Sequence, residues 1–254
     1  MAYSINAKNF FNTKLYTGTG SSLALTGVGF QPDMVWQKVR STTSSHRITD
    51  AVRGVGQVIY PNDTAQQSAE SAVTAFGTDG FTVGTESGSN TNGATYVGWS
   101  WKAGTGQGSA NTDGTINTTY TSVNTTSGVS ISKFVGTGAN ATVGHGLGVV
   151  PSMYMVKKLD SSGSWGVYHK SLGATKSLFL DLNDTGGTHI DYWNNTEPTS
   201  SVFSVGTSST HNYNNQNMIA YAFAEKTGFS KFGSYTAYEN VDGTFVYTGF
   251  KPAF

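Results

Sequence analysis

Short runs in which apolar and polar residues alternate recur along the whole chain. In the run from Tyr96 to Trp101, the side chains of Val97, Trp99 and Trp101 follow a period of two, which is the period of a β-strand. Similar runs are short, rich in β-branched and aromatic residues, and bounded by Gly, Asn, Asp or Pro. They lie at residues 34–36, 57–60, 129–134, 153–156, 178–180, 202–205 and 218–223. We therefore predict an all-β protein, in which residues 64–76 form a helical turn or a loop.

Five blocks of sequence recur in the same order, which indicates an internal repeat. For example, Phe30-Gln31-Pro32 returns as Val149-Val150-Pro151. The five pairs of blocks are 16–20 and 134–138, 30–38 and 149–157, 46–54 and 165–173, 80–84 and 202–206, and 96–101 and 218–223. A third copy begins near Tyr235 and reaches Phe250-Lys251-Pro252, where the Phe-x-Pro string returns.

The repeat predicts two tandem antiparallel β-sandwich modules of the jelly-roll or lectin-like kind, because short strands with apolar inner faces suit a core between two sheets. Residues 103–128 are rich in Gly, Ser, Thr and Asn. They form a flexible linker or an extra hairpin, and the alternation at 115–123 favours the hairpin. We predict an N-terminal arm at 1–13, a first module with this C-terminal hairpin at 14–128, a second module at 129–232, and a strand-forming tail at 233–254.

The composition of the chain says little about its fold, but it excludes several classes of function. The 254 residues include 15 basic and 15 acidic side chains and no cysteine. With a net charge of zero, the chain lacks the excess of basic residues that is typical of nucleic-acid-binding proteins. No apolar run approaches the ~20 residues that cross a bilayer. The first residues lack the pattern of a signal peptide. We therefore expect no nucleic-acid partner, no membrane insertion, no metal site and no cofactor.

The first candidate contacts for a ligand surround His46 and Asp50. Arg47 lies between them and Arg53 follows three residues after Asp50. Guanidinium groups match the carboxylates of acidic glycans, although they equally form ion pairs with Asp50. A His–Asp pair also suits acid–base chemistry. The equivalent positions of the second copy hold Trp165 and His169. Because the pair is not retained, structural polar contacts are favoured over ligand contact, and catalysis is disfavoured.

Two further candidates lie in loops of the second copy. Trp193 is flanked by Asp191 and Asn194, as in a platform on which a sugar stacks, while burial in a core is the default for so large a ring. His211 begins the polar segment 211–217, which is a contact surface or a solvated loop. The candidate glycan- or receptor-binding residues are Arg47, Arg53, Trp165, His169, Trp193 and His211. We predict no catalytic residue, because no pair of glycosidase carboxylates can be assigned.

Several of these strings together resemble the repeat module of tail-fibre and virion-appendage proteins of marine tailed bacteriophages. The strings are Leu15–Gly20, Gly29–Asp33, His46–Gly54, Asp79–Gly84, Val97–Gly104, Gly144–Gly148, Pro151, Trp165–His169, Gly228–Tyr235 and Asp242–Pro252. The resemblance covers nearly the whole chain after the first dozen residues. It implies a virion structural protein with lectin-like modules, and it carries over no binding site. Similar proteins continue past the motif at 250–252 into a further module, whereas this sequence ends at Phe254.

The expected function is therefore that of a non-enzymatic bacteriophage virion protein, a tail fibre or capsid-surface appendage that presents its modules to host-surface glycans. The alternatives are a purely structural decoration or cementing protein of the particle, and a glycan-degrading tailspike enzyme. Expected partners are other virion proteins, a host glycan or receptor, and further copies of the chain, with a trimer as the resemblance suggests. The expected location is the virion, assembled in the host cytoplasm and exposed on the particle surface.

Overall fold

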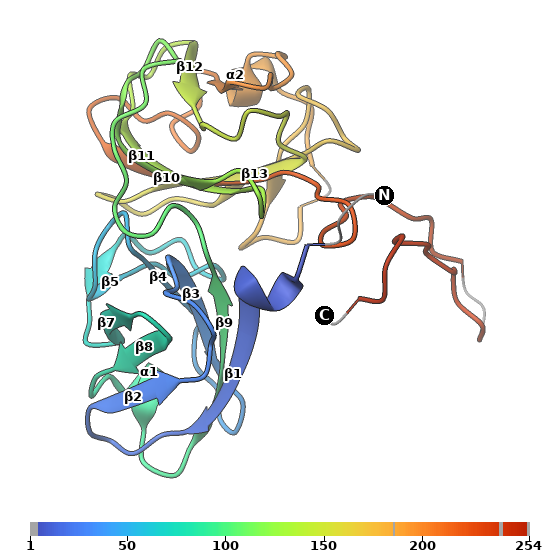
Figure 1. Cartoon of the computed structure of the whole chain (residues 1–254). Helices are drawn as coiled ribbons and strands as arrows, with labels where there is room; N and C mark the ends of the chain where they lie inside the picture. Colours follow the sequence, from blue (N-terminus) through green and yellow to red (C-terminus); the bar gives the residue numbers. More distant parts are fainter. Residues whose placement is uncertain (1–4, 185, 239–240, 253–254) are drawn as a thin grey trace.

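The computed structural model describes residues 5–184, 186–238 and 241–252, and it confirms the all-β prediction. Nearly all regular structure in these ranges is antiparallel β-strand. The chain forms two halves, with the first half below the second in Figure 1. The predicted helical turn or loop at 64–76 instead contains a short strand and the start of another.

The first half contains a four-stranded and a three-stranded antiparallel sheet. The larger sheet has the order β1 (Phe11–Thr17), β9 (Thr95–Trp101), β3 (Met34–Val39) and β4 (Arg47–Asp50). The smaller has the order β2 (Leu23–Thr26), β8 (Gly80–Val83) and β7 (Val73–Gly77). The short elements are η1 (Ala7–Asn9), β5 (Gln57–Val58), β6 (Ser68–Ala69) and α1 (Ser87–Asn90).

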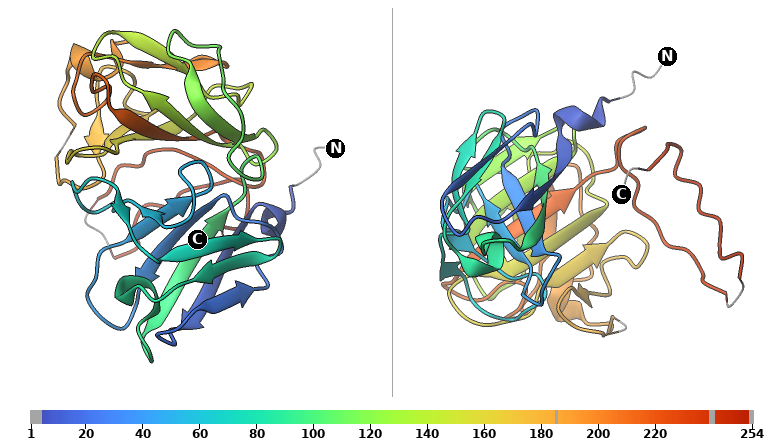
Figure 2. Two further views of the ribbon diagram at one scale, coloured as in Figure 1. Left: turned by 90° about the vertical axis from the view of Figure 1, so that its left-hand side faces the viewer. Right: turned by 90° about the horizontal axis from the view of Figure 1, so that it is seen from below.

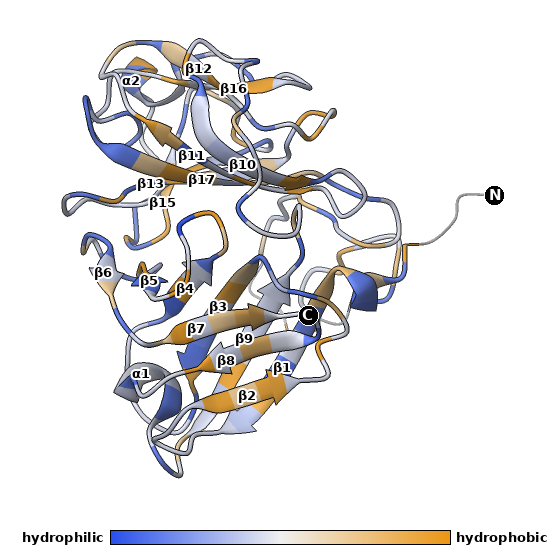
Figure 3. Cartoon of the chain, turned by 60° about the vertical axis from the view of Figure 1, so that its left-hand side comes forward, coloured by the Kyte–Doolittle hydropathy of each residue, from blue (hydrophilic) through white to orange (hydrophobic). Residues whose placement is uncertain are grey.

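A core between the two sheets makes this half β-sandwich-like. Val35 and Tyr96 of the larger sheet and Phe81 and Val83 of the smaller sheet are buried in one apolar cluster. Because successive side chains of a strand point to opposite faces, this packing leaves the neighbouring Trp36 on the other face of β3. Figure 3 shows the apolar positions gathered along these strands.

The second half is built around a six-stranded antiparallel sheet. Its order is β10 (Thr118–Asn124), β11 (Val129–Val135), β17 (Asn217–Phe223), β13 (Met153–Lys158), β14 (Gly166–His169) and β15 (Leu178–Phe179). A two-stranded sheet of β12 (Ala141–Gly144) and β16 (Val202–Val205) covers one face, with helix α2 (Ile190–Trp193) beside it. The core between them contains Phe134, Tyr154, Trp193 and Phe203.

The opposite face of the six-stranded sheet packs on one end of the first half. Ile131 and Tyr221 of the sheet join Met34 and Ile48 of the first half in a second apolar cluster. Met34 pairs with Asp50 and with Trp101, so these positions mark the end of the four-stranded sheet that is covered. Both faces of the six-stranded sheet are therefore buried. One face packs on the rest of the second half, and the other packs on the first half.

The structure corrects three of the predicted boundaries. The extra strand assigned to the first module is β10, which pairs with β11 in the sheet of the second half. Asn124 closes this hairpin, because its side-chain oxygen accepts from the N–H groups of Thr126 and Ser127. Strand β1 begins inside the predicted N-terminal arm. The described residues of the tail at 233–254 contain no strand, and Figure 2 shows this segment running out from the body and back.

Candidate functional site

Arg47 is held inside the first half by its own ion pairs. Its Nε atom donates to Glu70 at 2.9 Å, and Nη2 lies 3.4 Å from Glu86. The guanidinium also lies over the ring of Tyr60, 5.7 Å from its centroid. A Cβ atom on Gly88 would fall 1.9 Å from Nη1, so this glycine makes room for the group. The guanidinium group that was expected to bind a glycan carboxylate is already paired with the protein's own Glu70 and Glu86.

Arg53 belongs to a buried network between the two halves. Its side chain is 1% exposed, and its Nε donates to Asp50 Oδ2 at 2.5 Å. The hydroxyl of Tyr221, from the second half, donates to the same oxygen at 2.6 Å. Burial raises the pKa of Tyr221 well above its ordinary value, so this hydroxyl keeps its proton. The network joins the two halves and leaves Arg53 no access to an external anion.

The two candidate tryptophans are also internal, each 0% exposed. Trp165 donates its indole N–H to the carbonyl of Tyr60 at 2.8 Å and packs in the cluster between the halves. Trp193 donates to the carbonyl of Lys176 at 3.0 Å and packs in the core of the second half. The predicted sugar platform at Trp193 is therefore wrong. Its polar neighbour Asn194 ends helix α2 in the left-handed conformation, which explains the flanking residue without a ligand.

His211 is 0% exposed and lies edge-on to Trp193, with ring centroids 4.4 Å apart. Its ring nitrogens lie 2.9 Å from Ser177 Oγ and 3.1 Å from Ser208 Oγ. Burial lowers the pKa of His211 to about 3, so the ring is neutral at neutral pH. The expected polar contact surface at this residue is thus a hydrogen-bonded core position.

His169 is half-buried at the end of β14. Its Nδ1 accepts from the N–H of Ser171 at 3.2 Å, and burial lowers its pKa. The structure brings Trp193 and His211 into contact, while Arg47 and Arg53 make their ion pairs with different carboxylates. The six candidates therefore do not form one site.

The loop before α2 and the start of α2 are exposed, whereas Trp193 at the end of α2 is buried. Leu182 of the loop and Ile190 of α2 are 50% and 57% exposed, and the rings of His189 and Tyr192 lie 5.3 Å apart. Periodicity missed these positions because an exposed leucine in a loop follows no strand pattern. The signal that was available is the loop itself, since connecting segments with exposed side chains commonly carry binding residues.

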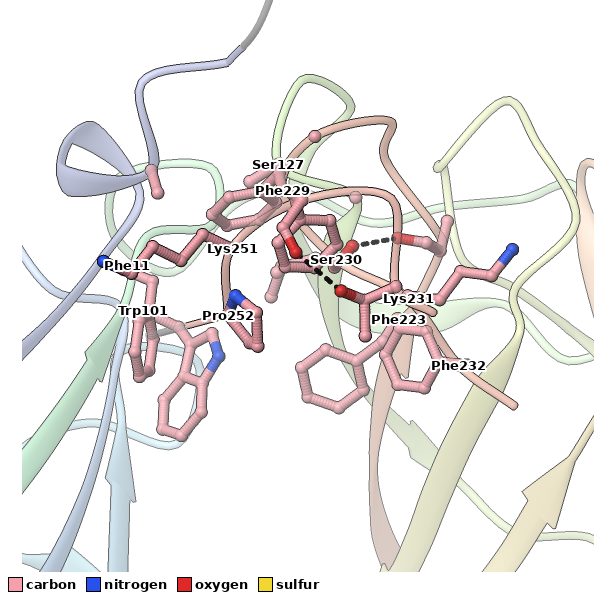
Figure 4. Close-up of a pocket in the computed structure, with 17 residues that line it drawn as sticks. Phe11, Trp101, Ser127, Phe223, Phe229, Ser230, Lys231, Phe232, Lys251 and Pro252 are labelled. Carbon is pink, nitrogen blue, oxygen red and sulfur yellow. Dashed lines mark hydrogen bonds between the residues drawn. The ribbon is translucent and has the colours of Figure 1, made fainter. Parts of the chain in front are cut away.

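A second feature that the sequence did not predict is an apolar groove at the edge where the two halves meet. Its volume is about 340 Å³, and it is formed by the beginning of β1, the ends of β9 and β17, the loop 228–232 and the returning tail 248–252. Figure 4 shows Pro252 between the side chains of Trp101 and Phe223 in this groove. The ring of Phe11 packs on Trp101 at 4.9 Å.

A small group of charges borders this groove. Glu225 lies 2.7 Å from the ammonium of Lys170 and 3.7 Å from that of Lys231. It also accepts from the backbone N–H of Phe232 at 2.8 Å. Although partial burial raises the pKa of Glu225, these donors and charges together hold it below its ordinary value. Glu225 thereby fixes the loop that forms one wall of the groove.

Within 5–184, 186–238 and 241–252, no three His, Cys, Asp or Glu side chains are placed to hold a metal ion. In the same part of the chain, no helix combines the length and hydropathy needed to cross a membrane.

The fold is that of an antiparallel, β-sandwich-like protein with an apolar groove between its halves. The family model described as a domain of unknown function, DUF7483, matches residues 6–254. The chain therefore belongs to this family, and the matched region includes both halves and the tail. No curated protein and no solved structure matches the chain.

Proposed function

We propose that this chain is a non-enzymatic structural protein of a tailed-bacteriophage particle, a component of a tail fibre or of the capsid surface. The observation that carries the proposal is the burial of the candidate ligand residues Trp165, Trp193 and His211. Residues that looked available for glycan contact build the cores and the joint between the halves. This favours the structural role, and the resemblance to phage appendage modules supplies the kind of particle.

We further propose that the two halves are tandem copies of one β-sandwich unit. The strand order β11-β17-β13-β14 of the second half parallels the order β1-β9-β3-β4 of the first. The pair β12–β16 likewise parallels the pair β2–β8. If β10 is left aside, the first strand of each proposed unit pairs antiparallel with the last, as β1 does with β9 and β11 with β17.

A buried asparagine supports the duplication at atomic detail. In the first half, Asn90 accepts from the N–H of Thr19 at 2.8 Å and donates to the carbonyl of Gly84. In the second half, Asn212 accepts from the N–H of Thr137 at 2.8 Å and donates to the carbonyl of Gly206. The same side chain thus ties the same two turns together in each half.

A second candidate function, adhesion to the host surface, is favoured by the exposed loop before α2. Leu182 of this loop and Ile190, the first residue of α2, are apolar and exposed. One such loop binds weakly, but many copies on one particle act together and gain avidity. The low charge of the chain also suits contacts in salt water, where charge interactions are screened within a few ångströms.

The test uses purified particles of the phage that encodes the chain. Mass spectrometry and immunogold labelling are expected to find it as a stoichiometric component of the particle. If the chain is absent from intact particles, the structural proposal is wrong. Incubation of host polysaccharide with the purified chain is expected to release no oligosaccharide, and release would support the enzyme alternative instead.

The adhesion candidate has its own assay. Purified chain at saturating dose is expected to compete with phage adsorption. The double variant Leu182→Ser/Ile190→Ser is expected to lose that competition, while the control Leu172→Ser, at another exposed leucine, retains it. Equal competition by both variants, or none by the unmodified chain, rejects adhesion through this loop and leaves the structural role unaffected.

A further inference from the structure

The tail that follows the second half is unusually apolar for an exposed segment. Phe245 and Tyr247 are 86% and 79% exposed, and Tyr235, Tyr238 and Val241 are exposed as well. Soluble monomers seldom expose a contiguous apolar patch of this kind unless it serves an interaction. The family model runs through the tail, so the segment is part of the matched region.

The residues 244–248 of the tail have the composition of a strand. Their sequence, Thr-Phe-Val-Tyr-Thr, contains only β-branched and aromatic residues, the types enriched in strands. Gly243 and Gly249 bound the segment on both sides. Thr244 donates its hydroxyl to the carbonyl of Thr236 at 2.8 Å, which holds the outgoing and returning arms of the tail near each other.

The four-stranded sheet of the first half ends at an open edge. In the second half, β11 has β17 on one side and β10 on the other. In the first half, β1 occupies the position of β11 and has β9 on one side, with no strand on the other among the described residues. Leu15, in the middle of β1, is 58% exposed. The N–H of Thr13 on this edge donates to Asn12 Oδ1 at 2.9 Å, but a strand with no neighbouring strand on one side is still a template for an added strand.

We propose that residues 244–248 of one copy add as a strand to the edge of β1 in a second copy. Addition of an extended segment to an exposed sheet edge is a common mode of association. Strand β10 shows that this sheet position accepts a strand in the second half. Phe250 and Pro252 of the tail line the molecule's own groove, and Tyr247 and Thr248 line a hollow beside the loop 225–231. The rest of the tail runs out from the body (Figure 2), and Phe245 and Tyr247 remain 86% and 79% exposed, so they are accessible to another molecule.

The proposed contact is heterologous, because each copy gives its tail and receives a tail at a different place. Such contacts build rings when the rotation closes and filaments when it does not. The inference goes beyond the structural role proposed above and is independent of it, since it concerns copies of this chain alone and is tested without phage particles.

The first experiment is sedimentation velocity of the full chain over a range of about 1–100 µM, where contacts of moderate affinity are resolved. The unmodified chain is expected to associate with rising concentration. The variant Val246→Pro, which removes a backbone donor within the strand, is expected to weaken association at least about tenfold. The matched control Val241→Pro, outside the strand segment, is expected to associate as the unmodified chain does.

The second experiment uses the absence of cysteine. Three chains with Thr13→Cys, Leu15→Cys or Thr17→Cys are each mixed with a chain carrying Val246→Cys and oxidised. Because a disulfide requires Cα atoms about 4.4–6.8 Å apart, a mixed dimer is expected for the position that faces Val246. A chain carrying both Leu15→Cys and Val246→Cys, oxidised at high dilution, tests whether the tail pairs instead with β1 of the same molecule.

Three outcomes overturn the proposal. The first is a monomer at every concentration, and the second is equal association of Val246→Pro and Val241→Pro. The third is an intramolecular disulfide in the double variant with no mixed dimer, which assigns the tail to its own sheet. Circular dichroism and thermal melts of each variant check that the body is folded, which is expected because the substituted residues of β1 and of the tail are all exposed.

Discussion

At the scale of single residues, buried polar side chains hold the loops of this protein together. His211 is the clearest, because both ring nitrogens bond to serine hydroxyls while the ring packs on Trp193. Gly166 makes this possible, since a Cβ atom there would lie 2.4 Å from His211 Nε2. His211 is therefore a core residue, and its ring becomes charged only at acidic pH.

This placement predicts acid sensitivity. Burial lowers the pKa of His211 to about 3, against about 6.5 in an unfolded chain. The unfolded state therefore binds the proton more readily, and stability falls as the pH drops from about 6.5 toward about 3. Between pH 7 and pH 4.5 the loss from this residue is about 2–3 kcal/mol.

Urea unfolding at both pH values measures the effect. His211→Gln is expected to flatten the dependence of the free energy of unfolding on pH, although it lowers stability at pH 7. The matched control His189→Gln changes an exposed histidine and is expected to keep the slope. An unchanged slope in His211→Gln would show that His211 does not become protonated on unfolding.

At the scale of strands, the sequence predicted where strands occur better than which strands pair. The alternating run at 96–101 is β9, and the runs at 129–134 and 218–223 lie in β11 and β17. Periodicity carries no information about the partner, so β10 was assigned to the wrong half. The candidate site was predicted poorly for a related reason: a ring beside Asp and Asn looks the same in one dimension whether those residues bind a ligand or end a helix.

Two glycines give a test at this scale, because Gly18 follows β1 and Gly136 follows β11, which holds the equivalent position in the second half. A Cβ atom on Gly18 would lie 2.2 Å from the carbonyl oxygen of Thr91, and one on Gly136 would lie 2.2 Å from that of Tyr213. Gly18→Ala and Gly136→Ala are each expected to lower stability by about 1–3 kcal/mol, the range for overpacking. Denaturant unfolding measures this, with Gly187→Ala as the control, since nothing lies within 4 Å of a Cβ there. Stability equal to that of the control would contradict the close approach at these turns.

At the scale of the whole molecule, the two halves are joined by an apolar cluster and a buried ion pair. Asp50 accepts from Arg53 of its own half and from Tyr221 of the other. Arg53 also donates to the carbonyls of Ile48 and Gln57. The joint is thus both apolar and hydrogen-bonded, and we expect the halves to unfold in one transition.

Removal of one charge from this joint is expected to be severe. Asp50→Asn leaves Arg53 buried without its counter-charge, which costs about 3–5 kcal/mol in comparable pairs. Differential scanning calorimetry is expected to show a lower Tm for both halves together. The double variant Asp50→Asn/Arg53→Met is expected to recover part of the loss. Two separate transitions in the unmodified chain would contradict the shared joint.

The six-stranded sheet has a consequence for any attempt to divide the chain. One face of the sheet forms part of the core of the second half, and the other face covers one end of the first half. A cut at residue 128 would separate β10 from its partner β11, and the fragment 129–254 would expose Ile131, Trp165 and Tyr221, which pack against the first half. We therefore expect neither half to fold stably on its own, although the internal repeat in the sequence suggests a border between them.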